Sequence, residues 1–209
     1  MSKRLYEESD IKAVADAIRA KNGSTGTYKL SEMATAISKI ETGGDTSVED
    51  AIVDRTISGN YTNDRVTSIG SYAFYGCQNL KSVNFPEVRR IEENSINSCV
   101  NLTTVFLPKV TYMNYYSLGG NYSLKAVVIT QTDSVCTLKS ALAFAGCYHI
   151  SGSKDATYNP DGLKDGYIYV PDTLVDSYKT ANNWSTFADQ IKPLSEFDES
   201  VLNGVHLIK

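Results

Sequence analysis

A 22-residue period runs through three consecutive stretches of the chain. Apolar residues return at four positions of each stretch, and a cysteine or an asparagine returns at a fifth. A fixed period of about 20–50 residues is typical of a solenoid, in which each unit buries its apolar face only against its neighbours. The aligned sets are Ile69, Ile91 and Met113; Cys77, Cys99 and Asn121; Leu80, Leu102 and Leu124; Val83, Val105 and Val127; and Phe85, Leu107 and Ile129.

Each unit is predicted to contain a turn followed by a short strand. In residues 81–85 we expect Val83 and Phe85 to face inward, because side chains alternate along a strand. A proline ends the strand in two units, since it cannot donate a ladder hydrogen bond. We also expect Asn101 to bond backbone groups in its turn. A small residue should allow neighbouring turns to approach closely; these residues are Gly76, Ser98 and Gly120.

A fourth copy of the repeat is interrupted by an insertion. Residues 143–147 closely repeat residues 73–77, but the strand that should follow appears only at 167–171. The intervening residues 151–166 are rich in Gly, Asp and Ser, which predicts a protruding loop. Insertions in repeat proteins usually emerge on one face, often the binding face.

Both ends of the solenoid need a cover, because an exposed apolar unit invites edge pairing. We assign residues 49–194 to the repeat domain with its caps and residues 195–209 to a C-terminal tail. The first cap is residues 49–65, with SGNYTNDR as a polar approach to the first repeat. The apolar residues expected to cover the ends are Ile52, Val53 and Ile57 at the start, and Leu174, Val175, Tyr178, Trp184, Phe187 and Ile191 at the end.

The first 40 residues are predicted to form a separate helical hairpin, joined to the repeats by a linker at residues 41–48. Gly43-Gly44 in this linker lacks any apolar anchor. Two helices of this size bury little surface alone, so we expect them to pack on a larger partner or on copies of themselves. Their apolar stripes, the candidate anchor residues, are Ile11, Val14 and Ile18, and Met33, Ile37 and Ile40.

Composition excludes several classes of protein. A net charge of −4 and a pI near 5.2 argue against a nucleic-acid binder. No apolar run is long enough for membrane insertion, and the first twelve residues lack the apolar stretch of a secretory signal, so we expect synthesis in the cytoplasm. The spacings of the four cysteines match no zinc or redox pattern, which favours small buried thiols in the repeat over metal ligands.

The repeat pattern I-G-x-x-A-F-x-x-C-x-N-L-x-x-V-x-F-P, from Ile69 to Pro86, resembles the BspA-like, Treponema-type leucine-rich repeats. The resemblance extends over about residues 50–193 and weakens in the third copy, where Asn121 and Thr130 replace Cys and Pro. It implies an α+β protein in which a short leucine-rich-repeat solenoid, with a parallel sheet on one side, follows the helical hairpin. It also implies binding to cell surfaces, proteins or glycans, and it supplies no general catalytic residues.

Residues 11–40 resemble a different group of proteins. The pattern ADAIRAKNG followed by AxAI is similar to a short helical segment at the start of many tailed-phage structural proteins. That resemblance implies that residues 1–40 attach to other phage structural proteins, with the repeat domain facing outward from the virion.

Tyrosine supplies the candidate binding residues, because its ring can stack on sugars and its hydroxyl can form hydrogen bonds. Packing between repeats is an equally good explanation for these side chains. If residues 115 and 116 are extended, they cannot both point inward, so one of them should be exposed. The six candidates are Tyr72, Tyr75, Tyr112, Tyr115, Tyr116 and Tyr122.

No catalytic residues, metal ligands or cofactor site are expected. His149 and His206 lack nearby acids in the sequence, and surface salt bridges explain the acids around Arg89-Arg90. The acidic loop at residues 155–165 lacks the order of an EF-hand, so a solvated loop is favoured over a calcium site.

The prediction is a non-enzymatic phage virion protein (a fibre, baseplate or head-attached component), present as a homo-oligomer, whose repeats bind bacterial surface protein or glycan. The alternative is a bacterial cell-surface adhesin of the same repeat family, against which the lack of an export signal counts. A glycan hydrolase ranks last, because no paired carboxylates stand out.

Overall fold

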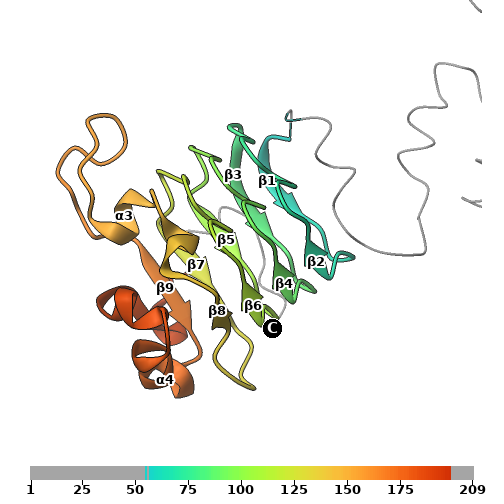
Figure 1. Ribbon diagram of the computed structural model, residues 1–209, viewed down its shortest axis with the longest axis vertical. Coiled ribbons are helices and arrows are strands. Elements are labelled where there is room, and N and C mark those ends of the chain that lie inside the picture. The colour runs from blue at the N-terminus through green and yellow to red at the C-terminus, as the bar shows by residue number, and fades with distance from the viewer. Residues whose placement is uncertain (1–54, 56, 199–209) are drawn as a thin grey trace, which may run out of the picture. The chain divides into compact units, whose positions relative to one another are not determined.

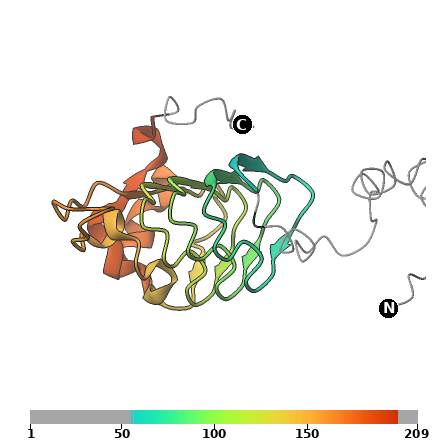
Figure 2. The same cartoon turned by 90° about the horizontal axis from the view of Figure 1, so that it is seen from above.

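The computed structural model describes Arg55 and residues 57–198. The predicted hairpin at residues 1–40, with its anchor residues, and the linker at 41–48 lie outside the described residues, as do Ile52 and Val53. What is described is a stack of coils built from two parallel sheets. Figure 1 shows the strands of each sheet side by side, and Figure 2 shows the two sheets on opposite sides of the coils.

The larger sheet has six strands in the order β1-β3-β5-β7-β9-β10. The first strand, β1, lies within the segment predicted to be a polar approach, so this segment already forms part of the sheet. Strand β9 confirms that the fourth repeat regains its strand after the insertion. The strands are β1 (Gly59–Thr62), β3 (Leu80–Asn84), β5 (Thr104–Phe106), β7 (Ala126–Val128), β9 (Tyr167–Val170) and β10 (Ile191–Pro193).

The smaller sheet has four strands of two residues each, in the order β2-β4-β6-β8. The family resemblance implies a parallel sheet on one side, and the structure adds this second sheet. It forms because the apolar residue that ends each short strand is buried, which holds successive backbones in line. The strands are β2 (Ser68–Ile69), β4 (Arg90–Ile91), β6 (Tyr112–Met113) and β8 (Thr137–Leu138).

The strand pairs confirm the 22-residue register. Val83 pairs with Val105, and Val105 pairs with Val127. In the smaller sheet Ile91 pairs with Met113. All of the aligned apolar positions are buried between the sheets, as are the cysteine positions. The repeats therefore form one continuous core, with each coil covering the next.

A second register joins the turns between the short and long strands. The Phe74 N–H donates to the Ser95 carbonyl at 2.6 Å, and the Ile96 N–H donates to the Ser117 carbonyl at 2.9 Å. The predicted close approach of small residues occurs here: a Cβ on Gly120 would lie 2.9 Å from the Ser98 Oγ. Gly76, Ser98 and Gly120 all have positive φ, which glycine adopts without strain.

The first coil is covered by the aromatic ring of Tyr61, from β1. Its ring centroid lies 5.4 Å from that of Phe74 and 5.9 Å from that of Phe85. Ile57 also packs on this end of the core, as predicted.

The last coil is covered by the helical cap that the sequence predicts. Trp184 lies 5.9 Å from the ring of Phe144, and its indole N–H donates to the Cys136 carbonyl at 2.6 Å. Tyr178, Phe187 and Ile191 are buried, and Leu174 and Val175 pack at the edge of the core. The helices at this end are η2 (Ala141–Phe144), α3 (Tyr148–Ser151), η3 (Asp172–Leu174), α4 (Val175–Thr180), η4 (Trp184–Gln190) and η5 (Leu194–Glu196).

The outer face of the larger sheet carries an apolar cluster that the sequence analysis missed. Phe106 and Val128 point away from the main core yet are fully buried. Leu194 and Phe197 pack on them, and the rings of Phe197 and Phe106 lie 6.0 Å apart. Packing therefore continues at least to Phe197, a residue that the sequence analysis places in the tail.

Candidate binding surface

One row of side chains stands out on the turns that lead from the short strands to the long ones. The backbone register places Tyr72, Asn94, Tyr116 and Leu142 at the same point of four successive coils, a set we call the tyrosine row. Tyr72 is 52% exposed, Tyr116 37% and Leu142 44%, which places them among the most exposed large apolar side chains of the described residues. Two coils separate the two tyrosines, a distance of about 10 Å for stacked strands.

The backbone of this row is in an unusual conformation. Tyr72, Asn94 and Tyr116 have φ values of 64°, 54° and 51°. Asparagine tolerates this left-handed region, but a bulky side chain rarely adopts it, and each such residue costs of order 1–3 kcal/mol. Strained residues are common where a side chain must be presented for function. The two tyrosines are therefore held outward at a cost that asparagine would avoid.

Amide side chains order the row between the tyrosines. The Asn94 Nδ2 donates to the Tyr72 hydroxyl at 3.2 Å, which leaves the phenolic proton free to bond a ligand. The Asn97 Nδ2 donates to the Asn94 Oδ1 at 2.9 Å and to the Tyr116 carbonyl at 3.3 Å. The row thus combines exposed rings with fixed hydrogen-bonding groups.

The six predicted tyrosines do not form one surface. Tyr72, Tyr75, Tyr115 and Tyr116 are exposed on or beside the tyrosine row, and the rings of Tyr72 and Tyr75 lie 5.7 Å apart. Tyr115 and Tyr116 are both exposed because the segment is a turn rather than an extended strand.

Two of the predicted tyrosines make structural contacts instead. On the outer face of β6, Tyr112 lies under the Arg90 guanidinium, which is 4.2 Å from the centroid of its ring. Tyr122 stacks on Tyr148 at 4.8 Å and contacts Tyr158 at 4.9 Å, beside the inserted loop. We therefore exclude Tyr112 and Tyr122 from the candidate surface.

Sequence reasoning missed Asn94 and Leu142 as members of the row. Leu142 escapes a strict 22-residue alignment because extra residues precede it. The repeated motif at residues 143–147 carried the necessary signal, since aligning it with residues 73–77 places Leu142 opposite Tyr72.

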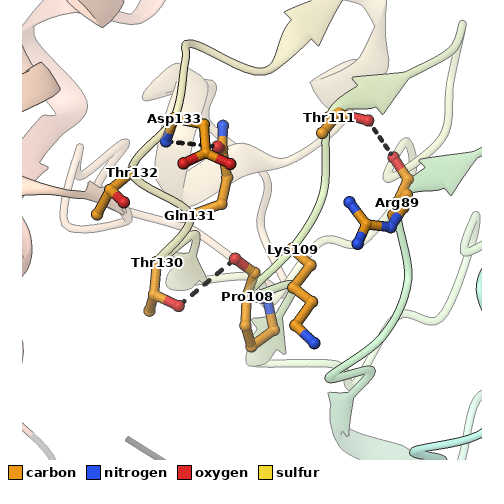
Figure 3. Close-up of a pocket in the computed structure, with 8 residues that line it drawn as sticks. All are labelled: Arg89, Pro108, Lys109, Thr111, Thr130, Gln131, Thr132 and Asp133. Atoms are coloured by element: carbon orange, nitrogen blue, oxygen red, sulfur yellow. Dashed lines mark hydrogen bonds between the residues drawn. The ribbon is translucent and has the colours of Figure 1, made fainter.

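A pocket of about 360 Å³ opens at the other connection of the coils, between the long strands and the short ones. Figure 3 shows Arg89 on one side, with Gln131 and Asp133 across from it. We call this depression the loop pocket. Its lining residues are Arg89, Pro108, Lys109, Thr111, Thr130, Gln131, Thr132 and Asp133.

The inserted loop is tied back to the coils by an acid that the sequence analysis did not connect to His149. The His149 Nδ1 lies 2.5 Å from the Asp165 Oδ1, and the Lys125 Nζ lies 2.8 Å from the Asp165 Oδ2. Partial burial favours the neutral acid, but the hydrogen bonds from Lys125 and His149 outweigh it and lower the pKa of Asp165. The prediction that His149 lacks a nearby acid is therefore wrong.

Other polar groups of the inserted loop are engaged within it. The Asp155 carboxylate accepts hydrogen bonds from the backbone N–H groups of Thr157 and Tyr158, both at 2.9 Å. Asn159 is buried, and its side chain bonds four backbone groups. In the described part of the chain, no group of three or more His, Cys, Asp and Glu side chains is placed to hold a metal ion.

The cysteines are buried and unpaired, as predicted for small residues in a repeat. The Cys99 Sγ donates to the Phe74 carbonyl at 3.0 Å, and the Cys147 Sγ donates to the Leu118 carbonyl at 3.1 Å. Burial raises the pKa of the Cys147 thiol to about 12 and also raises the pKa of Cys136. Protonated, buried thiols are poor nucleophiles, so Cys136 and Cys147 have a structural role.

Comparison with known proteins agrees with the repeat geometry. The model for the BspA type leucine-rich repeat region, with six copies, matches residues 56–154. These coils are similar to BspA-type leucine-rich repeats. The match covers a little under half of the chain, and no curated protein matches the chain as a relative.

The BspA-type match supports a repeat protein of the kind that binds other molecules at surfaces. It does not include residues 1–55, so the resemblance of the N-terminal segment to phage proteins stays a prediction. Among the described residues, no helix has the length and apolar character needed to cross a bilayer.

Proposed function

We propose that the protein is a non-enzymatic binding protein whose tyrosine row contacts a protein or glycan on a bacterial surface. The observation that carries the proposal is the exposure of Tyr72 and Tyr116 in a left-handed backbone conformation. A packing role does not require that conformation, because Asn94 occupies the same position between them.

The geometry of the row favours a ligand that lies along the stack of coils. Rings separated by about 10 Å can contact two units of an extended ligand, while the amides between them supply hydrogen bonds. Several weak contacts, multiplied over many copies of the protein, would give avidity without a deep pocket.

Binding of the labelled full-length protein to a bacterial glycan array and to whole bacterial cells tests this proposal. Tyr72→Asn combined with Tyr116→Asn should abolish binding and leave the fold intact, because Asn94 shows that asparagine fits this position. Leu163→Ser is the matched control: Leu163 is also 52% exposed but lies in the inserted loop. If the double variant binds as well as the wild type, the row is not the binding surface.

We further propose that residues 1–40 attach the protein to a phage virion, where it forms part of a fibre, a baseplate or a head-attached assembly. The support is the sequence resemblance of residues 11–40 to tailed-phage structural proteins. Deleting residues 1–45 should then remove the protein from purified particles in an immunoblot while the repeats still unfold cooperatively. Normal copy numbers of the truncated protein on particles would refute the attachment role, and a location on the bacterial envelope instead would favour an adhesin.

A further inference from the structure

The loop pocket owes its shape to one lengthened connection. Arg90 pairs with Tyr112, 22 residues later, but Tyr112 pairs with Thr137, 25 residues later. The connection between β7 and β8 therefore has three additional residues, and these allow residues 130–133 to form one wall of the pocket. A regular 22-residue coil would not form this pocket, which depends on the three additional residues of this one coil.

The additional residues are held in place by the side chain of Gln131. Its Oε1 accepts hydrogen bonds from the backbone N–H groups of Asp133 at 3.1 Å and Ser134 at 3.3 Å. Its Nε2 donates to the Ser134 carbonyl. The wall that carries the Asp133 carboxylate is thus ordered by its own hydrogen bonds.

Two threonine hydroxyls in the pocket already have acceptors for their protons. The Thr111 Oγ1 donates to the Arg89 carbonyl at 3.1 Å, and the Thr130 Oγ1 donates to the Pro108 carbonyl at 3.5 Å (Figure 3). Each hydroxyl therefore offers only lone pairs to a ligand. Together with the Asp133 carboxylate, they form a group of acceptors that requires a ligand with several donors.

The cations of the pocket differ in what they contact. The Lys109 Nζ is bonded to the Glu87 carboxylate at 2.6 and 2.7 Å, so its charge is largely balanced. Within the described part of the chain, no ion pair involves Arg89. Its guanidinium can offer a planar pair of donors to a carboxylate.

The geometry points to a binding site for a hydroxylated carboxylic acid of the size of one sugar ring, as in a uronic acid unit of an acidic glycan. Arg89 binds the ligand carboxylate, and the Asp133 carboxylate and the two threonine hydroxyls accept hydrogen bonds from the ligand hydroxyls. The presence of Asp133 disfavours a simple anion, which would be repelled without gaining those bonds. A volume of about 360 Å³ is at the lower end for small-molecule pockets, which run to about 1,000 Å³.

Three probes added to the isotope-labelled full-length protein test this site by NMR. Glucuronate carries both the carboxylate and the hydroxyls, glucose lacks the carboxylate, and acetate lacks the hydroxyls. Glucuronate should shift the backbone amides of Thr111 and of residues 130–133, whereas glucose and acetate at the same concentration should not. An equal response to acetate would indicate a simple anion site and overturn the proposal. A response to none of the probes would also overturn it.

Variants at neighbouring arginines provide a matched comparison. Arg89→Gln should weaken glucuronate binding at least tenfold, whereas Arg90→Gln should leave it unchanged, because Arg90 bonds Glu92 and covers Tyr112 outside the pocket. An equal loss of glucuronate affinity in both variants would mean that binding depends only on the positive charge of this region and not on Arg89 itself. The paired tyrosine variant of the tyrosine row should keep full glucuronate binding, so failure of either site is distinguishable from failure of the other.

Discussion

The side-chain oxygen of Asn121 accepts a hydrogen bond from the backbone N–H of Cys99, one coil earlier, at 2.9 Å. The amide nitrogen of the same residue donates to the carbonyls of Ile96 at 2.7 Å and Leu118 at 2.8 Å. Asn121 is fully buried, so no water replaces these partners. One side chain thus satisfies three backbone groups at a position where the neighbouring coils have cysteine.

Asn121→Ala should lower the free energy of unfolding by about 2–4 kcal/mol, because it leaves buried backbone groups without partners. Asn121→Cys should cost less, since Cys99 donates its thiol to the equivalent carbonyl one coil earlier, that of Phe74, and the introduced thiol can do the same toward Ile96. Urea unfolding of the two variants measures the difference. Equal destabilisation by alanine and cysteine would show that the amide network contributes little.

Leu102→Ala tests the buried ladder. Leu102 is fully buried, and removing its side chain should cost about 2–5 kcal/mol through lost burial and a residual cavity. The control is Leu142→Ala at the 44%-exposed leucine of the tyrosine row, which should change stability by no more than about 0.5 kcal/mol. Thermal melts compare the two, and an unchanged melting temperature for Leu102→Ala would contradict the repeat register.

Replacing either strained tyrosine should not destabilise the protein. Tyr72→Asn or Tyr116→Asn relieves a left-handed backbone strain of order 1–3 kcal/mol, which offsets the loss of a ring that is only half-buried at Tyr72 (52% exposed) and more buried at Tyr116 (37% exposed). We therefore expect an equal or higher melting temperature for each variant. Tyr75→Asn, at a neighbouring exposed tyrosine without positive φ, serves as the control and should show no such gain. A clearly lower melting temperature for the variants at positions 72 and 116 would mean that the two rings stabilise the fold by packing and are not simply presented to solvent.

Acid should weaken the attachment of the inserted loop. Because the folded state lowers the pKa of Asp165, the unfolded chain binds a proton at higher pH than the native chain. The stabilisation is complete above the unfolded value, near 3.8, and is lost as the pH falls through the lower folded value. Asp165→Asn should therefore be less stable than the wild type at pH 7, and the gap should narrow at pH 3. A gap that does not depend on pH, measured by urea unfolding, would rule out the ionised acid as its cause.

Much of the core could be predicted from the sequence because the period repeats apolar residues at fixed positions. Val83, Val105 and Val127 face inward, as expected from the alternation of side chains along a strand. Trp184 covers the last coil, as expected from the apolar residues around it in the sequence. The smaller sheet could not be predicted, since strands of two residues have no alternation to detect.

The candidate sites were less predictable because they depend on backbone geometry. Tyr72 and Tyr116 are exposed through a left-handed turn, and no sequence pattern distinguishes this from an extended segment. The contact of His149 with Asp165 arises because the inserted loop returns to its starting point after sixteen residues. The loop pocket depends on three additional residues whose position only the strand pairing reveals.

The register of the turns has a consequence for how such a protein can evolve. Because Ser98 and Gly120 meet the following coil through the same backbone hydrogen bond, duplication or deletion of a gene segment for one 22-residue coil would preserve this backbone contact. Each such event would lengthen or shorten the tyrosine row by one residue. The coil that is copied or lost would determine whether this residue is tyrosine or asparagine. The reach of the surface can therefore change in whole units, with no redesign of the core.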